Sequence, residues 1–287
     1  MTLKERYFWA ALGLIAISWI VNSLYAHSKQ LEEPIFLDHY METTTDENDH
    51  NYVTFYYLAN KNDQSHINYI RLGDAEGFPQ RDYFYTDTTA PYAIDTYNHQ
   101  DLRSITVKLR SFSDNIEEQS FNEMEVFYSD GRSSTASIGE VIIHPKRYYW
   151  NEDTSALEQP SSGSSNDGSS WDTFRATEPS AIEKIDFPFN EPIEDRFNFT
   201  ISGKQTEQPL DSLKLPIQLE KDKSVTLRVN FKEKSFVNPF EFAIRISGTT
   251  EQGKPFTNYA HYNLFPYLTQ DDVNRIIEEK TGRDSGE

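Results

Sequence analysis

The alternation of apolar and polar residues over short stretches most restricts how this chain can fold. Residues 105–110 read ITVKLR and residues 225–230 read VTLRVN, so every second residue is apolar in both. A period of two is typical of a β-strand with one buried and one solvated face. Similar stretches recur along the chain with turn signals between them, which predicts a mainly β protein built of two tandem β-sandwiches. They are Ig-like in architecture only, because the cysteine pair of immunoglobulin domains is absent.

The expected strands divide into two sets of seven. The first set lies near residues 35–42, 52–59, 66–72, 81–86, 103–110, 122–128 and 135–143. The second lies near residues 171–176, 181–187, 195–202, 213–219, 224–231, 240–247 and 257–265. Five apolar blocks keep their order in both sets, about 115 to 122 residues apart. This correspondence predicts an internal duplication, the alternative being chance similarity among amphipathic strands.

A polar segment separates the two sets. The second half of residues 151–170 consists almost entirely of Ser, Gly, Asn and Asp, which bury too little surface to become ordered. We expect a Ser/Gly-rich linker there, between a first sandwich over residues 34–150 and a second over 171–287. A flexible linker between two similar domains would suit bivalent binding.

A helix is expected near the C-terminus, over residues 270–281. Thr269 can cap its first turn and Gly282 can end it. Leu268, Val273, Ile276 and Ile277 offer a short apolar stripe. We expect this helix to pack on the second sandwich, the alternative being a docking helix for another protein.

The N-terminus carries a long uncharged segment. The twenty residues 7–26 contain no charge and, as a helix, would span the roughly 30 Å of a bilayer's hydrocarbon core. This predicts a single-pass transmembrane signal-anchor followed by a juxtamembrane segment, 27–33. Basic residues before the helix favour residues 1–6 as a cytoplasmic tail and an extracytoplasmic location, at the cell membrane, for the rest. A cleaved signal peptide is the alternative, although Leu24 occupies a position where a small residue is preferred.

Composition excludes several classes of function. The chain has no cysteine, so disulfides and thiolate chemistry are excluded. The first six residues hold two of its 27 basic and one of its 46 acidic residues, which leaves a net charge of −20 beyond the tail. Such a surface repels nucleic acid, so we expect no nucleic-acid partner.

Motifs for catalysis are also absent. The sequence has no HExxH, GxSxG, SxxK, GxGxxG or complete P-loop GxxxxGK[ST], and its seven histidines are dispersed. We therefore expect no catalytic, cofactor-binding or metal-binding residues and no enzyme activity. The acidic residues within 43–50 could hold calcium, but they lack the EF-loop pattern, so a solvated loop is favoured.

Two aromatic clusters are the candidate ligand contacts. They comprise Tyr83 and Tyr85, and Tyr148, Tyr149 and Trp150. Exposed rings could stack on sugars, whereas alternation along a strand would bury about half of them in a core. Core packing is the simpler interpretation.

These observations predict a membrane-anchored extracytoplasmic protein that acts as a non-catalytic binding or assembly module. We expect its partner to be another membrane or surface protein. The alternative is a binder of cell-surface or wall polysaccharide, and an enzyme of unfamiliar type is third. The cysteine-free, Lys-, Asn- and Asp-rich composition with one anchor resembles that of surface proteins of Gram-positive bacteria, a resemblance of style that carries no functional residue.

Overall fold

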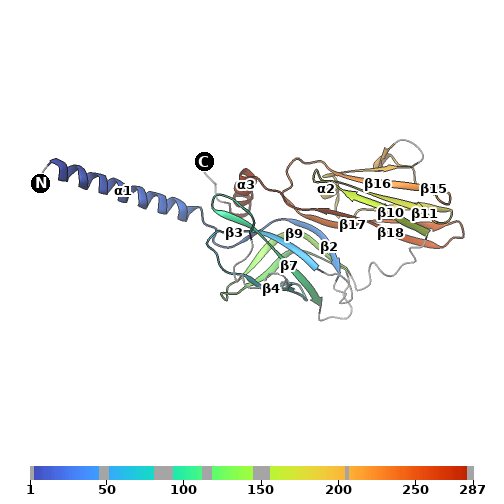
Figure 1. The fold of residues 1–287 in the computed structure, drawn as a ribbon. Helices are drawn as coiled ribbons and strands as arrows, with labels where there is room; N and C mark the ends of the chain where they lie inside the picture. Colours follow the sequence, from blue (N-terminus) through green and yellow to red (C-terminus); the bar gives the residue numbers. More distant parts are fainter. Residues whose placement is uncertain are drawn as a thin grey trace.

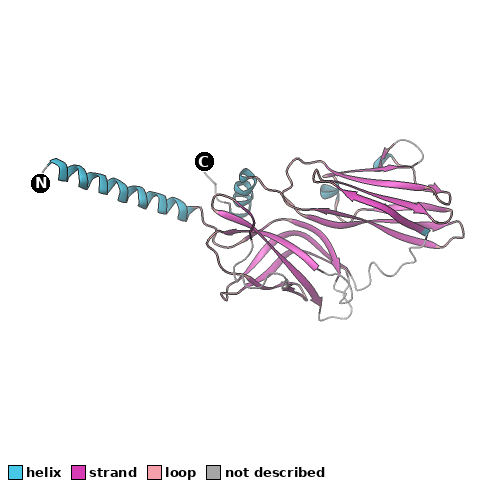
Figure 2. Cartoon of the chain, viewed as in Figure 1, coloured by secondary structure: helices cyan, strands magenta, loops and turns pink. Residues whose placement is uncertain are grey.

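A computed structural model describes residues 3–44, 52–80, 93–111, 118–144, 156–203 and 207–282. Helix α1 (Leu3–Ser28) extends alone from two groups of strands, and a short helix, α3 (Gln270–Thr281), lies near the C-terminus (Figure 1). Strands dominate both groups (Figure 2). The predicted fold class, mainly β with an N-terminal and a C-terminal helix, is confirmed.

Helix α1 has the properties expected of a membrane span. Residues Tyr7–Ser28 are long and apolar enough to cross a bilayer, and their side chains are exposed along the whole helix. Trp9 and Trp19 are 55% and 77% exposed, which is unusual for tryptophan in water. The apolar surface surrounds the helix instead of forming a stripe, as expected for a helix in lipid.

The first sandwich is formed by the strands from β1 to β9. Their bounds are β1 (Ile35–Phe36), β2 (His39–Thr44), β3 (Tyr52–Asn60), β4 (Ile67–Leu72), β5 (Ala75–Pro79), β6 (Ala93–Thr96), β7 (Gln100–Ser111), β8 (Gln119–Tyr128) and β9 (Ser133–His144). Strand β5 pairs with both β7 and β4 and so joins the two layers along one side. The core between the layers contains the fully buried Phe55, Val107, Leu109 and Val126. The apolar residues that alternate with polar ones in β7 thus lie on the buried face of the strand, as the sequence predicts.

The second sandwich is formed by the strands from β10 to β18. Their bounds are β10 (Leu157–Ser164), β11 (Ser169–Ala176), β12 (Ser180–Asp186), β13 (Phe197–Ser202), β14 (Gln208–Pro209), β15 (Ile217–Leu219), β16 (Ser224–Phe231), β17 (Phe240–Thr250) and β18 (Pro255–Leu264), with a short helix α2 (Glu191–Glu194) and a 3-10 turn (Leu210–Ser212). One layer has the order β10-β11-β16-β13-β14 and the other contains β15-β12-β17-β18. Phe197 lies at the centre of the core, with its ring 5.0 to 5.8 Å from those of several other aromatic residues.

The two sandwiches repeat the same strand pairings. Strand β4 pairs with β8, which pairs with β9, and β12 pairs likewise with β17, which pairs with β18. In the opposite layers, β3 pairs with β7 and β11 with β16. The sequence correspondence aligns β4 with β12, β7 with β16, β8 with β17 and β9 with β18. The topology of these strands agrees with an internal duplication.

The prediction of a linker is wrong over the described part of residues 151–170. Residues 157–164 form β10, and β11 begins at Ser169. The two strands make an antiparallel hairpin that places β10 at the edge of its sheet. An edge strand can be held by backbone hydrogen bonds to one neighbour, so a segment rich in Ser and Gly can form one without burying large side chains. Residues 151–155 lie outside the described residues.

The C-terminal helix has the predicted bounds but packs on the first sandwich. Its capping box at Thr269 and its left-handed C-cap at Gly282 are both present. The apolar stripe of α3 forms one buried cluster with residues of the first sandwich and of the segment after α1, namely Leu31, Ile35, Leu37, Leu58 and Leu102. The expectation that it packs on the second sandwich is therefore wrong. The chain after β18 returns to the first sandwich, where α3 covers an apolar surface at the end nearest α1 (Figure 1).

Strand β2 joins the two sandwiches into one sheet. It pairs in parallel with β9 on one side, and on the other with the start of β17, where Tyr40 lies opposite Phe240 and Met41 opposite Glu241. A sheet of 13 strands therefore includes strands of both sandwiches. A flexible tether between two independent domains, and the bivalent binding that it would allow, do not fit this arrangement.

A buried carboxylate in the second sandwich gives a first prediction. Asp172 is 5% exposed, and burial raises its pKa from 3.8 to about 6, although a hydrogen bond from Gln159 acts in the opposite direction. The Asp172 carboxyl ionises at a lower pH in the unfolded chain than in the folded protein. This residue therefore lowers the free energy of unfolding increasingly as pH rises from about 4 to above 6. Asp172→Asn should stabilise the protein by about 2–3 kcal/mol at pH 8 and by ~1 kcal/mol at pH 4.5. Urea unfolding at both pH values measures this. The exposed Asp74→Asn is the control, and an equal effect at both pH values would contradict the assignment.

Candidate functional site

The aromatic residues proposed as ligand contacts lie outside the described residues. This holds for Tyr83 and Tyr85 and for Tyr148, Tyr149 and Trp150. Most of the acidic stretch 43–50 is likewise outside them. Within the described ranges, no group of three or more His, Asp or Glu side chains could hold a metal ion. The structure instead brings together two polar clusters, one at each end of the first sandwich.

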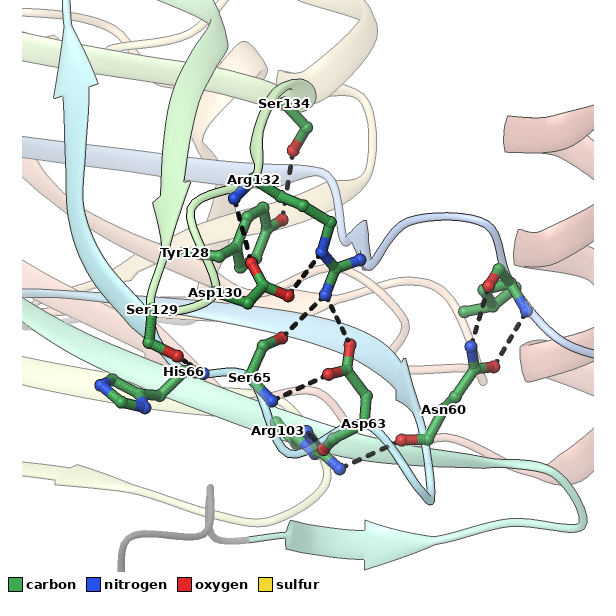
Figure 3. Close-up of polar contacts among 11 residues, drawn as sticks. Asn60, Asp63, Ser65, His66, Arg103, Tyr128, Ser129, Asp130, Arg132 and Ser134 are labelled. Carbon is green, nitrogen blue, oxygen red and sulfur yellow. Dashed lines mark hydrogen bonds and ion pairs between the residues drawn. The ribbon is translucent and has the colours of Figure 1, made fainter.

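The first cluster, here called the anchor clamp, consists of Leu31, Asn60, Gln100 and Arg103. The main chain leaves α1 at Ser28 and reaches Leu31, which is only 7% exposed. The Asn60 side chain bonds this residue twice. Its Oδ1 accepts the Leu31 N–H at 2.9 Å and its Nδ2 donates to the Leu31 carbonyl at 2.8 Å (Figure 3). Gln100 donates to the carbonyl of Lys29 at 2.8 Å. The segment after α1 is therefore fixed to β3 and β7 within a few residues of the helix end.

Arg103 supports the turn that carries Asn60. Its side chain is 3% exposed and donates to the carbonyls of Asp63 at 2.9 Å and Asn60 at 3.1 Å. Its guanidinium also lies 3.4 Å from the carboxylate of Asp101. From the neighbouring turn, Arg132 reaches the side chains of Asp63 and Ser65 (Figure 3). A buried guanidinium with carbonyl acceptors fixes backbone geometry, so Arg103 determines where Asn60 meets Leu31.

The second cluster, here called the junction cluster, lies where β2 meets the second sandwich. Tyr40 stacks on Phe240 with ring centroids 5.1 Å apart and planes 18° apart. The guanidinium of Arg196 lies 5.8 Å from the Tyr40 ring and 5.2 Å from the Phe240 ring. Arg196 is itself held by two bonds to Glu233, at 2.6 and 2.8 Å. An aromatic side chain of the first sandwich is thus inserted into the aromatic core of the second.

Two buried titratable groups complete the junction cluster. The side chains of Glu42 and His144 are each 3% exposed, and Glu42 Oε2 lies 2.5 Å from His144 Nε2. The other oxygen of Glu42 accepts the backbone N–H of Ala243 in β17 at 3.0 Å. On the far side of the ring, His144 Nδ1 lies 2.9 Å from Glu118 Oε2. A cavity of about 220 Å³ borders these groups. Glu42 therefore links a histidine of β9 to the backbone of the second sandwich.

A row of aromatic side chains lies on the outer face of the first sandwich. Tyr69 and Phe127 are cross-strand partners whose rings stack at 4.2 Å with planes 10° apart. Phe78, 41% exposed, lies 6.0 Å from Tyr69, and the guanidinium of Arg71 lies 5.4 Å from Phe127. This row was not predicted from the sequence. Its aromatic residues occupy the strand positions that point away from the core, where polar residues are expected. Because the ring faces of Tyr69 and Phe127 cover one another, mainly ring edges face the solvent.

Sequence reasoning also missed both clusters. A signal was present, because Arg103 interrupts the apolar phase before ITVKL and His144 ends the apolar run VIIH. A charged or titratable residue at a strand position that faces the core needs a hydrogen-bonding or oppositely charged partner. Those partners are distant in sequence: Glu42 meets Ala243 across 201 positions. A single sequence does not reveal such pairs.

Comparisons with known proteins do not identify a family. No family model matches the chain, and no curated protein matches it. Among solved structures, it is similar to one described as the Pseudomonas aeruginosa CupB2 chaperone, at 6% sequence identity and a TM-score of 0.17. The match covers 80% of this chain and 100% of that one. At this TM-score the likeness carries no argument about fold or function.

Proposed function

We propose that this protein is a single-pass, membrane-anchored extracytoplasmic module that binds or assembles with a protein partner and has no catalytic role. The observation that carries the proposal is the anchor clamp. An apolar helix with exposed sides enters a folded β-structure through a short segment whose backbone is bonded to Asn60 and Gln100. Such a connection holds the sandwiches in a fixed orientation to the helix, which suits a module that presents a surface at a set position above a membrane.

The orientation follows from charge. Two of the first six residues are basic, which favours a cytoplasmic N-terminus, and the remainder carries a net charge of −20. An acidic ectodomain favours a partner with a basic surface, because opposite potentials speed association and discriminate against other acidic proteins. The cell membrane is the location that this topology suggests.

The absence of cysteine makes the orientation testable by single-cysteine labelling. Lys221 is exposed in the second sandwich, so Lys221→Cys should react with a membrane-impermeant maleimide in intact cells. Thr2→Cys should react only after the membrane is permeabilised. Cells that express the wild-type chain are the control. This chain has no cysteine, so any label that they take up is on other proteins. Labelling of the Thr2 variant alone in intact cells would overturn the proposed orientation.

Binding to a surface polysaccharide is a second candidate, favoured by the aromatic row of Tyr69, Phe78 and Phe127. Sugars stack on open ring faces, whereas two of these rings face each other. Ring edges beside Arg71 suit packing against protein better, so the protein partner takes precedence.

Cross-linking in intact cells separates the two candidates. The full-length protein would be purified from membranes after cross-linking and its products identified by mass spectrometry. One protein recovered in near-stoichiometric amount would support the assembly role. Recovery of no protein partner, together with co-sedimentation of the protein with purified wall polysaccharide, would overturn it in favour of the second candidate. Wild type and Phe78→Ser should be compared, with the exposed Glu123→Gln as control, to test whether the aromatic row takes part.

A further inference from the structure

The last turn of α1 already touches the first sandwich. The ring of His99, in the turn between β6 and β7, lies 6.0 Å from the ring of Tyr25 with the planes 70° apart. Tyr25 belongs to the apolar stretch Tyr7–Ser28, and at roughly 1.5 Å per residue it lies only about 4.5 Å before the end of the helix. A residue of the sandwich therefore lies beside the apolar helix itself, at the depth of its last turn.

Hydrogen bonds keep two neighbouring turns of the sandwich at this level. The side chain of Gln100 donates to the carbonyl of Lys29 at 2.8 Å, one residue after the helix ends. The N–H of Lys61, in the turn after β3, donates to the carbonyl of His99 at 3.4 Å. Both turns therefore lie at the end of α1 and cannot move away from it without breaking these bonds.

The residues around this point suit the boundary between lipid and water. Tyrosine rings gather at the headgroup level of membranes, and a lysine beyond the span extends its ammonium group towards water and phosphate. Tyr25 lies near the end of the apolar helix, and the ammonium group of Lys29 lies 5.6 Å from its ring. With Tyr25 at headgroup level, His99 lies at the same level, and the exposed Asn98 and Lys61 offer N–H donors beside it.

The charges at this end of the sandwich are of both signs. Arg132 pairs with Asp63 at 3.5 Å and with Asp130 at 2.6 Å, so its charge is compensated within the protein. Lys61 is exposed, and so is Glu33 in the segment after α1. A surface of mixed charge has little attraction for anionic lipid in particular. Contact with a bilayer would therefore depend on the position of α1 and not on the charge of the lipid.

We propose that the end of the first sandwich that carries the anchor clamp, here called the clamp end, rests on the bilayer. The turn of residues 97–99 lies among the phospholipid headgroups, where Asn98 and Lys61 donate to phosphate oxygens. This inference rests on the proposed membrane anchor and adds the surface by which the folded part meets the lipid. Contact beside the helix limits tilting of the module, which one helix crossing a bilayer does not prevent. The second sandwich, on the far side of the first from α1, is then kept clear of the bilayer (Figure 1).

Fluorescence quenching in lipid nanodiscs measures this contact on the full-length chain, which has no native cysteine. A fluorophore on Asn98→Cys should lose more than half of its intensity when phosphatidylcholine carries a nitroxide on its headgroup. The loss should be unchanged when phosphatidylglycerol is added. Asp74→Cys, exposed at the opposite end of β4, is the matched control, because the six residues of that strand place it roughly 20 Å from the clamp end. Its label should lose little intensity.

A fluorophore on Leu14→Cys, in the middle of α1 and 69% exposed, separates failure of this inference from failure of the membrane anchor. A nitroxide in the acyl chains should quench it. Quenching at Leu14→Cys without loss at Asn98→Cys would leave the anchor in place and overturn the contact. A loss at Asn98→Cys that appears only with phosphatidylglycerol, or an equal loss at Asp74→Cys, would overturn the contact as well. No quenching at Leu14→Cys by the acyl-chain nitroxide would overturn the proposed anchor and the contact with it.

Discussion

Arg103→Ala is expected to lower the free energy of unfolding of the first sandwich by about 3–5 kcal/mol, as when one partner of a buried ion pair is removed. Its side chain is 3% exposed and donates to two carbonyls of the turn after β3. Removal leaves these carbonyls without that donor and leaves Asp101, 9% exposed, beside a cavity. The turn would relax and withdraw Asn60 from Leu31, so the link between α1 and the sandwich should loosen as well.

Urea unfolding of the detergent-solubilised protein measures the stability. Arg103→Lys keeps the charge but loses the two-branched geometry of the guanidinium, so it should lie between Arg103→Ala and wild type. Arg110→Ala, exposed on the same strand, is the matched control. A loss for Arg103→Ala no larger than that of the control would show that Arg103 does not organise the turn. Asn60→Ala removes both side-chain bonds to Leu31 but keeps Arg103, so it tests the clamp separately.

The sequence predicts the strands that bury one face and solvate the other. Strand β16 has the bounds expected from VTLRV, and β7 and β17 differ from expectation only at their ends. The C-terminal helix has the predicted bounds because its caps, Thr269 and Gly282, are local features. Periodicity and capping depend on neighbouring residues, so they can be read from one chain.

Features that depend on contacts distant in sequence were not predicted. Strand β10 resembles a linker because its pairing with β11 uses the backbone, which composition does not report. The apolar stripe of α3 indicates that the helix packs but not on which sandwich. The connection of the sandwiches through β2 requires Tyr40 to meet Phe240, 200 positions away. The anchor clamp and the junction cluster depend on the same kind of contact, which explains why neither was found from the sequence.

Acidification is expected to destabilise the protein through His39, which lies at the start of β2 and is fully buried. Burial lowers its pKa from 6.5 to about 3. The geometry agrees, because Nε2 accepts the N–H of Tyr56 at 2.8 Å and would lose this bond on protonation. Below pH 6.5 the unfolded chain binds a proton at this site that the folded chain does not bind until about pH 3. Stability contributed by neutral His39 is therefore present above pH 6.5 and is lost as pH falls, at up to about 1.4 kcal/mol per pH unit.

The expected loss from this residue between pH 7 and pH 4.5 is about 2–3 kcal/mol. Replacement by His39→Gln, whose amide oxygen can accept the Tyr56 N–H, removes the titration. The two proteins should differ in the slope of unfolding free energy against pH, whatever their stability at neutral pH. Asp172 takes up a proton over part of this range with the opposite effect, and the comparison cancels its contribution because both proteins retain it. The exposed His66→Gln should keep the wild-type slope. Parallel curves for wild type and His39→Gln would mean that the imidazole at position 39 takes up its proton as readily in the folded protein as in the unfolded chain. That result would refute the assignment of a buried histidine that stays neutral.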